Sequence, residues 1–290
     1  MRIMVLLRII RMNTKILPNK ITGISTTLLI PLWAKAVEYG RSDALLQDVE
    51  AVRMLQMLDY DFNKFSNARL SQPGCCGRSS IIDHETLKFI EKHPDCVVVH
   101  LGAGLDARFE RLQKPNVTAW YDLDLPDVMF IRRQLLPESG NYYLSDSLFN
   151  DSWMCTVAAY NKPVLILLEG ILMYFDENEV KMFFAKIAEY LPQVTVIFDM
   201  LPPIALNKAK HHDALKNIND DERPEFKWTL VDTKIMESWQ QNLKITDEFY
   251  LSQVCAKRYP CWLRLIYKTA WGRRYFDPRI VRIELNNHIE

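Results

Sequence analysis

The sequence has no excess of charge of either sign. Its 290 residues include 36 lysines and arginines and 36 aspartates and glutamates, so the formal net charge is zero. A folded protein that binds nucleic acid normally carries a basic excess or a basic stripe on one face. The charge balance therefore excludes nucleic acid as the main partner of this chain.

Long apolar runs are also missing. No segment reaches the roughly 18 uninterrupted apolar residues that a membrane-spanning helix needs. Residues 1–11 look like the start of a signal peptide, but Arg8 breaks their apolar run and no small-residue cleavage site follows. Met12 offers an alternative start. We therefore expect residues 1–11 to be an artefactual leader, and we expect a cytoplasmic protein without a membrane partner.

Neither the cysteines nor the histidines are spaced for a disulfide framework or a metal site. The six cysteines contain no C-x-x-C pair, and a chain of this length does not need disulfides for stability. His211 and His212 are neighbours, but no Asp, Glu or Cys stands at a metal-site spacing from them. The sequence predicts reduced thiols, which agree with a cytoplasmic location, and it predicts no metal.

What the sequence does contain is an alternation of short apolar runs and helical patterns. The runs expected to form strands are residues 96–101, 117–121, 141–144, 164–168, 194–198 and 279–284. Asp176, with Glu179 three residues later, has the pattern of a capping box at the start of a helix. Strands that alternate with helices predict an α/β fold built on a Rossmann-like, doubly wound sheet.

The patterns divide the chain into three regions. Residues 1–77 are expected to form an N-terminal helical region. Residues 78–202 and 244–290 are expected to form the ligand-binding core. Between these two parts, residues 203–243 turn polar and helical in pattern, which indicates a helical cap inserted over the sheet.

Ligands of such sheets bind outside the carboxyl ends of the strands, so polar residues at those ends are candidates. Gly102 and Gly104 follow the first strand, and glycines allow backbone N–H groups to approach a ligand closely. Asp122 and Asp124 follow the second strand, where a carboxylate can accept both hydrogen bonds from a ribose diol. Methyltransferases and nicotinamide-dependent dehydrogenases share this glycine pattern, so by itself it leaves both open.

Other polar residues stand at comparable places. Asp146 and Ser147 follow the third strand and can contact an adenine edge, although a polar turn has the same pattern. Glu169 directly follows the buried fourth strand, where a carboxylate is costly unless a cationic group pairs with it. Arg78 lies in a loop of small residues, from which an arginine can hold a carboxylate through two hydrogen bonds.

The order and spacing of these motifs resemble the leucine carboxyl methyltransferase family, and most closely its bacterial branch of tetracenomycin-type polyketide O-methyltransferases. The likeness covers residues 24–199, with Ala107 where the family usually has threonine. The segments that carry it are Arg78-Ser79, Leu101-Gly-Ala-Gly-Leu-Asp106, Tyr121-Asp-Leu-Asp-Leu-Pro126 and Leu168-Glu-Gly-Ile-Leu-Met-Tyr-Phe175. The resemblance implies a class I methyltransferase fold, mostly parallel with a late antiparallel strand, and S-adenosylmethionine as the methyl donor.

The resemblance also implies a role for each candidate residue. Arg78 would hold the methionyl carboxylate, and Glu169 would meet the methionyl ammonium. Gly102 would line the methionine pocket, and Asp124 would hold the ribose. The adenine would be flanked by Asp146 and Ser147.

The methyl acceptor is the part of the reaction that the motifs constrain least. A carboxylate is ionised at neutral pH and needs no general base, whereas an alcohol or phenol benefits from one. The sequence offers no convincing base, since His211 and His212 are candidates only through their place in the expected cap. This absence favours a carboxyl group or a phenol of low pKa. The resemblance to the bacterial branch implies a small, polyketide-like or other hydrophobic acceptor.

Three alternatives stay open at this point. A protein carboxyl terminus is another possible acceptor within the same family. A nicotinamide-dependent oxidoreductase would share the glycine pattern, but a Tyr-x-x-x-Lys pair does not stand at the expected place. A non-catalytic nucleoside-binding protein would keep the same ligand contacts. The sequence does not determine the oligomeric state.

Overall fold

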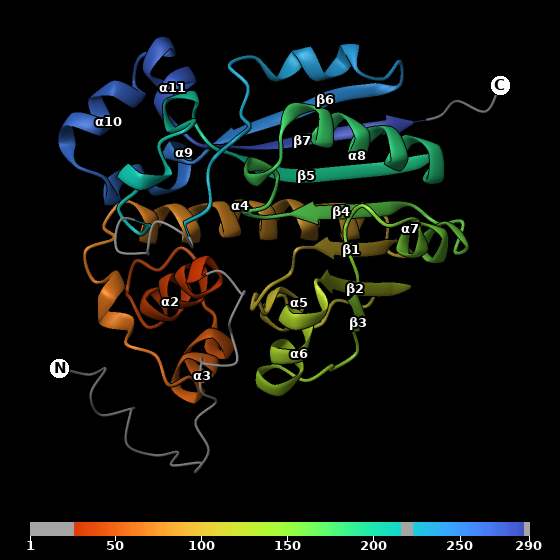
Figure 1. The fold of residues 1–290 in the computed structure, drawn as a ribbon, viewed down its shortest axis with the longest axis horizontal. Helices are drawn as coiled ribbons and strands as arrows, with labels where there is room; N and C mark the ends of the chain where they lie inside the picture. The colour runs from red at the N-terminus through yellow and green to blue at the C-terminus, as the bar shows by residue number, and fades with distance from the viewer. Residues whose placement is uncertain (1–25, 216–222, 287–290) are drawn as a thin grey trace.

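A seven-stranded sheet forms the centre of the computed structural model, which describes residues 26–215 and 223–286 (Figure 1). The expected leader, residues 1–11, lies outside the described residues. The strand order is β3-β2-β1-β4-β5-β7-β6. Neighbouring strands from β3 to β5 are parallel, and β7 runs antiparallel to both β5 and β6. The expected Rossmann-like sheet with a late antiparallel strand is confirmed.

Six of the seven strands correspond to runs expected from the sequence. They are β1 (Val97–Leu101), β2 (Ala119–Asp124), β3 (Tyr142–Ser145), β4 (Val164–Leu168), β5 (Gln193–Met200) and β7 (Arg279–Asn286), and β6 (Leu243–Tyr250) completes the sheet. The strand β2 extends through Asp124, so Asp122 and Asp124 are strand residues rather than turn residues. Every residue of β1 and β4 is buried, which explains why these strands lack polar alternation.

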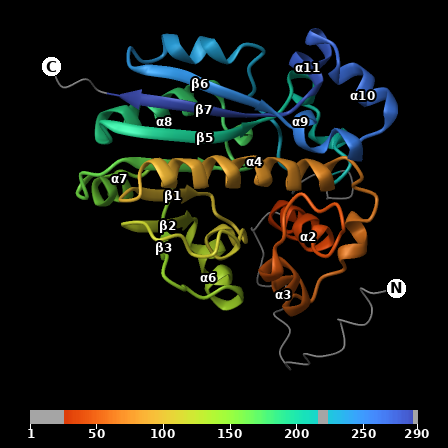
Figure 2. The ribbon, with the colours of Figure 1, turned by 180° about the vertical axis from the view of Figure 1, so that it is seen from behind.

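Helices cover both faces of the sheet. The helices α7 (Asp151–Ala158) and α8 (Glu177–Tyr190) pack on one face. The long helix α4 (Ser71–Lys92) crosses the opposite face (Figure 2). The expected capping box at the start of α8 is confirmed, because the Asp176 side chain accepts from the Glu179 N–H and the Glu179 side chain accepts from the Asp176 N–H.

The small residues before the sheet belong to α4 and not to a loop. Arg78, expected in a loop, lies in the second turn of this helix, and the boundary expected between residues 77 and 78 falls inside it. Pro73 is tolerated because it stands in the first helical turn, where its missing N–H has no intrahelical partner. Small side chains at this point let α4 approach α9 (Ser252–Cys255) closely. The misassignment followed from reading small residues as loop formers.

The N-terminal region packs over the carboxyl ends of the strands. Its elements are η2 (Thr26–Leu28), α2 (Leu29–Glu38), α3 (Val49–Met57) and η3 (Phe62–Phe65). Their apolar side chains share a cluster with Leu105 after β1, with Val128 and Ile131 of α6 (Pro126–Leu135), and with Met173 of η4 (Leu172–Tyr174). This packing places α2 directly above the strand ends where ligands bind in such folds.

The region expected to be a helical cap has little helix in its described part. Residues 203–215 and 223–243 contain η5 (Pro203–Ala205), η6 (Ala209–His211) and η8 (Thr233–Ser238), and turns or irregular chain make up most of the rest. The helical structure at this corner comes later in the chain. Between β6 and β7 stand α9, η9 (Ala256–Arg258), α10 (Cys261–Tyr267) and α11 (Ala270–Phe276).

Three structural observations bear on the broad class of the protein. Among the helices described, none is both long and apolar enough to cross a membrane. The described residues contain no group of three or more His, Cys, Asp or Glu side chains able to hold a metal ion. All six cysteines are free, and four of them are buried.

Candidate functional site

Four segments converge at the carboxyl edge of the sheet. The loop after β1 contacts the end of β2, because the Gly104 N–H donates to the Asp124 carboxylate over 2.7 Å. The segment after β3 joins them, since the Asp146 N–H donates to the Asp124 carbonyl over 3.0 Å. Ile171, after β4, lies against Gly102. Gly102, Gly104, Asp124 and the backbone of Asp146 therefore line one continuous edge.

Gly102 has the backbone of a residue that only glycine adopts without strain. Its φ angle is +63°, and an added Cβ would lie 2.3 Å from the Ile171 Cδ1 atom. The turn therefore requires both the conformational freedom and the absent side chain of glycine. This requirement explains the glycine at the strand end that the sequence pattern singled out.

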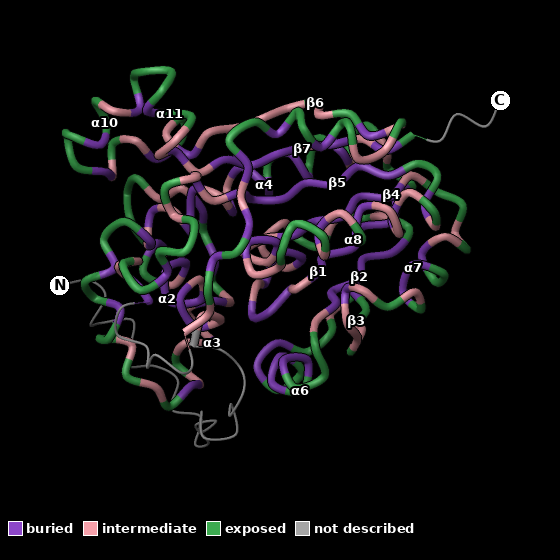
Figure 3. The backbone as a smooth tube through the Cα atoms, turned by 45° about the horizontal axis from the view of Figure 1, so that its top comes forward, coloured by how far each residue is buried: buried purple, intermediate pink, exposed green. Residues whose placement is uncertain are grey.

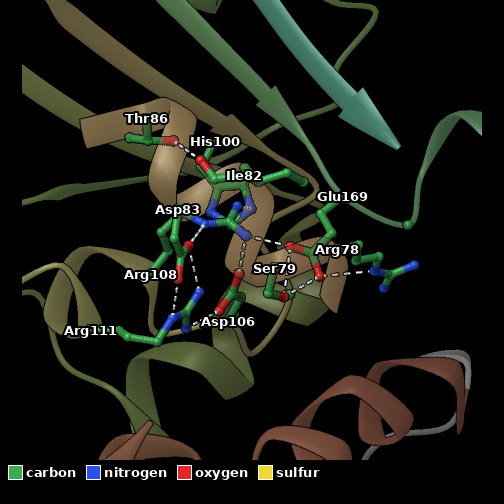
Figure 4. A network of polar contacts seen from close by, with 12 residues as sticks. Arg78, Ser79, Ile82, Asp83, Thr86, His100, Asp106, Arg108, Arg111 and Glu169 are labelled. Atoms are coloured by element: carbon green, nitrogen blue, oxygen red, sulfur yellow. Dashed lines mark hydrogen bonds and ion pairs between the residues drawn. The ribbon is translucent and has the colours of Figure 1, made fainter. Parts of the chain in front are cut away.

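Glu169 lies at the centre of a buried network of ions (Figure 4). Its carboxylate accepts from the Ser79 hydroxyl over 2.7 Å, from Arg78 Nε over 3.0 Å, and from Arg108 Nη2. The Glu169 side chain is only 4% exposed. A carboxylate has about four lone-pair positions, and these three donors occupy three of them. One position is therefore left for a further donor.

The network extends well beyond Glu169, and we call it the ion cluster. Lys35 of α2 reaches Asp106 over 2.8 Å, and Arg108 and Arg111 of α5 (Arg108–Arg111) both contact Asp83. The complete cluster consists of the cations Lys35, Arg78, Arg108 and Arg111 and the carboxylates Asp48, Asp83, Asp106, Glu169 and Asp199. Five carboxylates against four cations give the cluster one excess negative charge when all are ionised.

The cations of the cluster keep its central acids ionised. Burial by itself raises the pKa of Glu169, but Lys35, Arg108 and Arg78 together hold that pKa well below its usual range. Burial likewise opposes ionisation of Asp106, yet the neighbouring cations, Arg111 first among them, lower its pKa strongly. The edge of the sheet therefore presents permanent negative charge at Glu169.

Arg78 connects the ion cluster to a neighbouring cavity. Its Nη1 atom donates to Asp199 over 3.0 Å and its Nε atom donates to Glu169, whereas Nη2 makes no hydrogen bond within the described residues. Asp199, at the end of β5, also accepts from the Gly170 N–H over 2.6 Å. Burial raises the pKa of Asp199, although Arg78 opposes the shift. Arg78 thus keeps one pair of N–H donors available.

Asp122 and Asp124 have different surroundings despite their similar positions in the motif. The Asp122 side chain is fully buried and accepts from Arg132 over 3.0 Å, from Asn141 over 2.5 Å and from the Trp120 ring N–H over 3.1 Å. Asp124 is half-buried and, among the residues that the structure describes, accepts only two backbone N–H groups, those of Gly104 and Leu125. A ligand hydroxyl can therefore reach the Asp124 carboxylate, whereas the Asp122 carboxylate is enclosed by its own hydrogen-bond partners.

Asp146 and Ser147 form a turn at the start of α7. The Asp146 carboxylate accepts from the Ser147 N–H over 2.8 Å, from the Asn150 side chain and from the Ser152 hydroxyl. Both residues are half-buried. The turn lies beside Asp124 through its backbone, while the carboxylate of Asp146 is engaged in holding the turn itself.

An apolar cavity of about 420 Å³ lies next to Arg78. Arg78 and Asp199 of the ion cluster line it, together with Tyr174. His212 stands among the residues of the expected cap that also line it. The residues named at the edge of the sheet, from Gly102 to Glu169, do not line this cavity, so the edge and the cavity are two adjoining sites that share Arg78.

Several residues of the site were not singled out from the sequence. Lys35, Ser79, Arg108 and Asp199 all contact Glu169 or Arg78. Lys35 stands in the otherwise apolar stretch LIPLWAKAV, residues 29–37, and is 2% exposed. A lysine inside an apolar helix is a signal of a buried ion pair, because an unpaired buried ammonium is too costly. The partner of such a lysine cannot be read from the local sequence.

Comparison with known proteins gives consistent matches. Residues 34–188 match the family model described as leucine carboxyl methyltransferase. Over 231 residues the chain is 30% identical to the tetracenomycin polyketide synthesis O-methyltransferase TcmP of Streptomyces glaucescens, which covers 79% of this chain and 84% of that protein. It is 29% identical over 188 residues to the S-adenosyl-L-methionine-dependent methyltransferase dpfgK of Gibberella zeae, with coverages of 59% and 62%.

Solved structures have more distant similarity. The magnesium protoporphyrin IX methyltransferase ChlM of Synechocystis PCC 6803 with bound SAM aligns with a TM-score of 0.46 at 11% sequence identity. The alignment covers 82% of this chain and 98% of that chain.

Proposed function

The chain belongs to the leucine carboxyl methyltransferase family and is an S-adenosylmethionine-dependent methyltransferase, and from this we propose that it methylates a carboxyl or hydroxyl group of a small, hydrophobic, polyketide-like acceptor. The observation that supports the proposal best is the arrangement at Arg78. On one side of this residue stands a charged edge suited to an amino-acid nucleoside, and on the other an apolar cavity suited to an acceptor.

The residues at the edge of the sheet fit S-adenosylmethionine group by group. Arg78 has an unused Nη2 donor for the methionyl carboxylate, and Glu169 has room for one donor from the ammonium. Asp124 accepts two backbone N–H groups and keeps lone pairs for the ribose hydroxyls. Our proposal leaves Asp122 out of the cofactor site, because its carboxylate is enclosed by core residues.

The charge of the ion cluster also suits this cofactor. S-adenosylmethionine carries a carboxylate, an ammonium and a sulfonium, and therefore one net positive charge. The cluster has one carboxylate more than it has cations, so the bound cofactor would balance it. Asp146 and Ser147 remain the proposed adenine contacts through their place beside Asp124.

Methyl transfer from this cofactor requires alignment of the two reactants more than activation of the leaving group. When bound, S-adenosylmethionine supplies a methyl group on a sulfonium that is already a good leaving group. The residues of this chain then have to hold the two reactants in line and keep water away, which can supply roughly 7–11 kcal/mol of the barrier. Arg78 and Glu169 are held by several contacts each, which fixes the part of the site proposed for the methionyl carboxylate and ammonium. The apolar cavity can exclude water around an acceptor.

The main test measures cofactor binding and methyl transfer separately. We expect calorimetric titration to show binding of S-adenosylmethionine and S-adenosylhomocysteine and none of NAD. Labelled methyl groups should then be transferred to one or more members of a panel of aromatic acids and phenols, with peptides that end in a free carboxylate as the comparison. Binding of NAD in place of S-adenosylmethionine would contradict the assignment. Transfer to peptides alone would replace the small acceptor by a protein terminus.

Replacing Gly102 by alanine should weaken cofactor binding by about tenfold or more. The positive φ angle makes alanine strained by about 1 kcal/mol, and the new Cβ collides with Ile171, so the loop after β1 has to move. Titration of S-adenosylmethionine against the variant measures the effect. Gly140 supplies a matched control, since its φ angle is also positive, +126°, but its Cβ position is sterically open at 3.4 Å or more. The Gly140→Ala variant should lose stability without losing affinity.

His212 distinguishes a hydroxyl acceptor from a carboxyl acceptor. It lines the cavity and stands 3.4 Å from the Ser71 hydroxyl, and burial lowers its pKa, which favours the neutral form that can accept a proton. If the acceptor is a hydroxyl, His212→Asn should lower kcat by about 10²-fold or more. If it is a carboxylate, kcat should stay nearly unchanged. The exposed His84 on α4 provides the control variant His84→Asn.

A further inference from the structure

One corner of this neutral protein is strongly basic. Residues 252–276, which form α9, η9, α10 and α11, contain no aspartate or glutamate. Their cations are Lys257, Arg258, Arg264, Lys268, Arg273 and Arg274. Because the whole sequence has equal numbers of acidic and basic residues, its net charge does not reveal this basic segment.

Most of these cations have no carboxylate partner in the described part of the chain. Arg258 is paired with Glu38 over 2.9 Å, and Arg274 with Asp232 over 3.1 Å. The other four are exposed and form no ion pair among the described residues: Lys257, Arg264, Lys268 and Arg273. Arg273 stands over the Tyr250 ring instead. The corner therefore carries positive charge that its own fold does not balance.

Large apolar side chains are exposed on the same helices. Trp262 is 57% exposed, Leu265 63% and Trp271 61%. Figure 3 shows α10 and α11 as largely exposed segments at a corner of the molecule. On α10, Trp262 and Leu265 are three residues apart and so lie on one helical face. Exposed tryptophan and leucine among unpaired cations are the pattern of a helix that lies in a membrane interface.

The same two helices form part of the wall of the apolar cavity. Leu263 and Tyr267 of α10 and Phe276 of α11 line the cavity from their buried side. Trp262 lines it and is also exposed, so the outer face continues into the cavity. A surface bound to α10 and α11 would therefore stand beside the cavity.

We propose that α10 and α11 dock on an anionic lipid bilayer, with Trp262, Leu265 and Trp271 entering the headgroup region and the unpaired cations contacting acidic lipids. This inference goes beyond the proposed function, since it concerns where the protein binds and not which group it methylates. A bilayer-spanning segment is not needed for such docking. A membrane partner was not expected from the sequence, because only the folded structure shows that Trp262, Leu265 and Trp271 are exposed.

Two other occupants fit the corner less well. A second copy of this chain would bring the same positive charge against it, which opposes self-association. Nucleic acid would satisfy the cations, and tryptophans can stack on bases, but an exposed leucine has no base to stack on. Leu265 instead suits a hydrocarbon environment.

The test uses the full chain and lipid vesicles. In co-sedimentation, we expect binding to vesicles of phosphatidylcholine mixed with phosphatidylglycerol, weaker binding as the salt concentration rises, and little binding to phosphatidylcholine alone. The charge-reversed variant R264E/K268E should reduce vesicle affinity by about tenfold or more. The variant K92E/K244E makes the same change in net charge at exposed lysines elsewhere and should reduce it by less than about threefold.

The apolar contribution is tested with L265S/W271S, neither of which lines the cavity. We expect this variant to lose vesicle binding while its affinity for S-adenosylmethionine and its melting temperature stay close to those of the original chain. Equal vesicle binding by R264E/K268E and K92E/K244E would overturn the proposal. So would a dimer in light scattering that L265S/W271S dissociates, or tighter binding to a single-stranded oligonucleotide than to the acidic vesicles. Vesicle binding is read without methyl transfer, so its failure is separate from failure of the proposed function.

Discussion

Glu169→Gln should abolish measurable binding of S-adenosylmethionine, with a loss of affinity of about 100-fold or more, and should lower the free energy of unfolding by roughly 3–5 kcal/mol. The neutral amide forms no ion pair with Arg78 and Arg108. Its NH₂ group also places N–H donors against the N–H donors of these arginines. The same change removes the charge that the cofactor ammonium would meet. Calorimetric titration and denaturant unfolding measure the two effects.

A second carboxylate of the ion cluster separates these effects. Asp83 of α4 pairs with Arg108 over 2.8 Å and with Arg111 over 2.7 Å, and it is not among the residues assigned to the cofactor. Asp83→Asn should lower stability by a similar amount but leave cofactor affinity within about threefold, provided that both variants are measured where they are folded. Equal affinities of Glu169→Gln and the original chain would remove Glu169 from the cofactor site.

Asp124→Asn should mainly reduce the affinity for the cofactor, whereas Asp122→Asn should mainly reduce the stability of the fold. We expect Asp124→Asn to weaken S-adenosylmethionine binding by about 10- to 100-fold and to lower the free energy of unfolding by about 1–3 kcal/mol, because its new NH₂ group faces one of the two backbone N–H donors, those of Gly104 and Leu125. Asp122→Asn leaves Arg132 buried without its counter-ion, and should cost roughly 3–5 kcal/mol of stability with nearly unchanged affinity. Loss of affinity in the Asp122 variant alone would reverse the proposed assignment of the ribose contact.

The pH dependence of binding offers an independent check on Asp124. Burial raises the pKa of this carboxyl group, although the N–H groups of Gly104 and Leu125 oppose the shift. Protonation removes hydrogen-bond acceptors that the ribose would use, so affinity should fall as the pH is lowered through that pKa. The Asp124→Asn variant cannot titrate at this position and should have a flatter profile. An identical pH profile in both proteins would argue against a direct contact.

The sequence predicted the strands of the core well because their signals are local. The runs at β1 and β4 are continuous and apolar, as strands buried on both faces must be, and the structure begins β4 at Val164 and ends it at Leu168 as expected. The capping box at Asp176 is equally local, since both of its hydrogen bonds join residues three apart. Such features need no information from distant parts of the chain.

The errors occurred where packing overrides local preference. The residues around Arg78 are small and include glycine and proline, which indicates a loop, yet they form the first turns of α4 against α9. In the described part of residues 203–243, the expected helices are replaced by three short 3-10 helices, turns and irregular chain. In both places the final conformation depends on what the segment packs against, which a single sequence does not state.

By itself, the sequence determined the type of sheet, the glycine turn after β1 and the presence of carboxylates at the ends of β2 and β4, because each depends on a short run of residues. Only the tertiary structure decided how these features lie relative to one another. Asp124 lies two strand residues, about 7 Å, beyond Asp122. This distance places Asp124 at the edge of the sheet, while Asp122 stays in the core beside Arg132. It also decided that Lys35 closes the ion cluster, and that Trp262, Leu265 and Trp271 are exposed among the cations of α10 and α11. Contacts between distant residues are set by packing, and packing is a property of the whole chain.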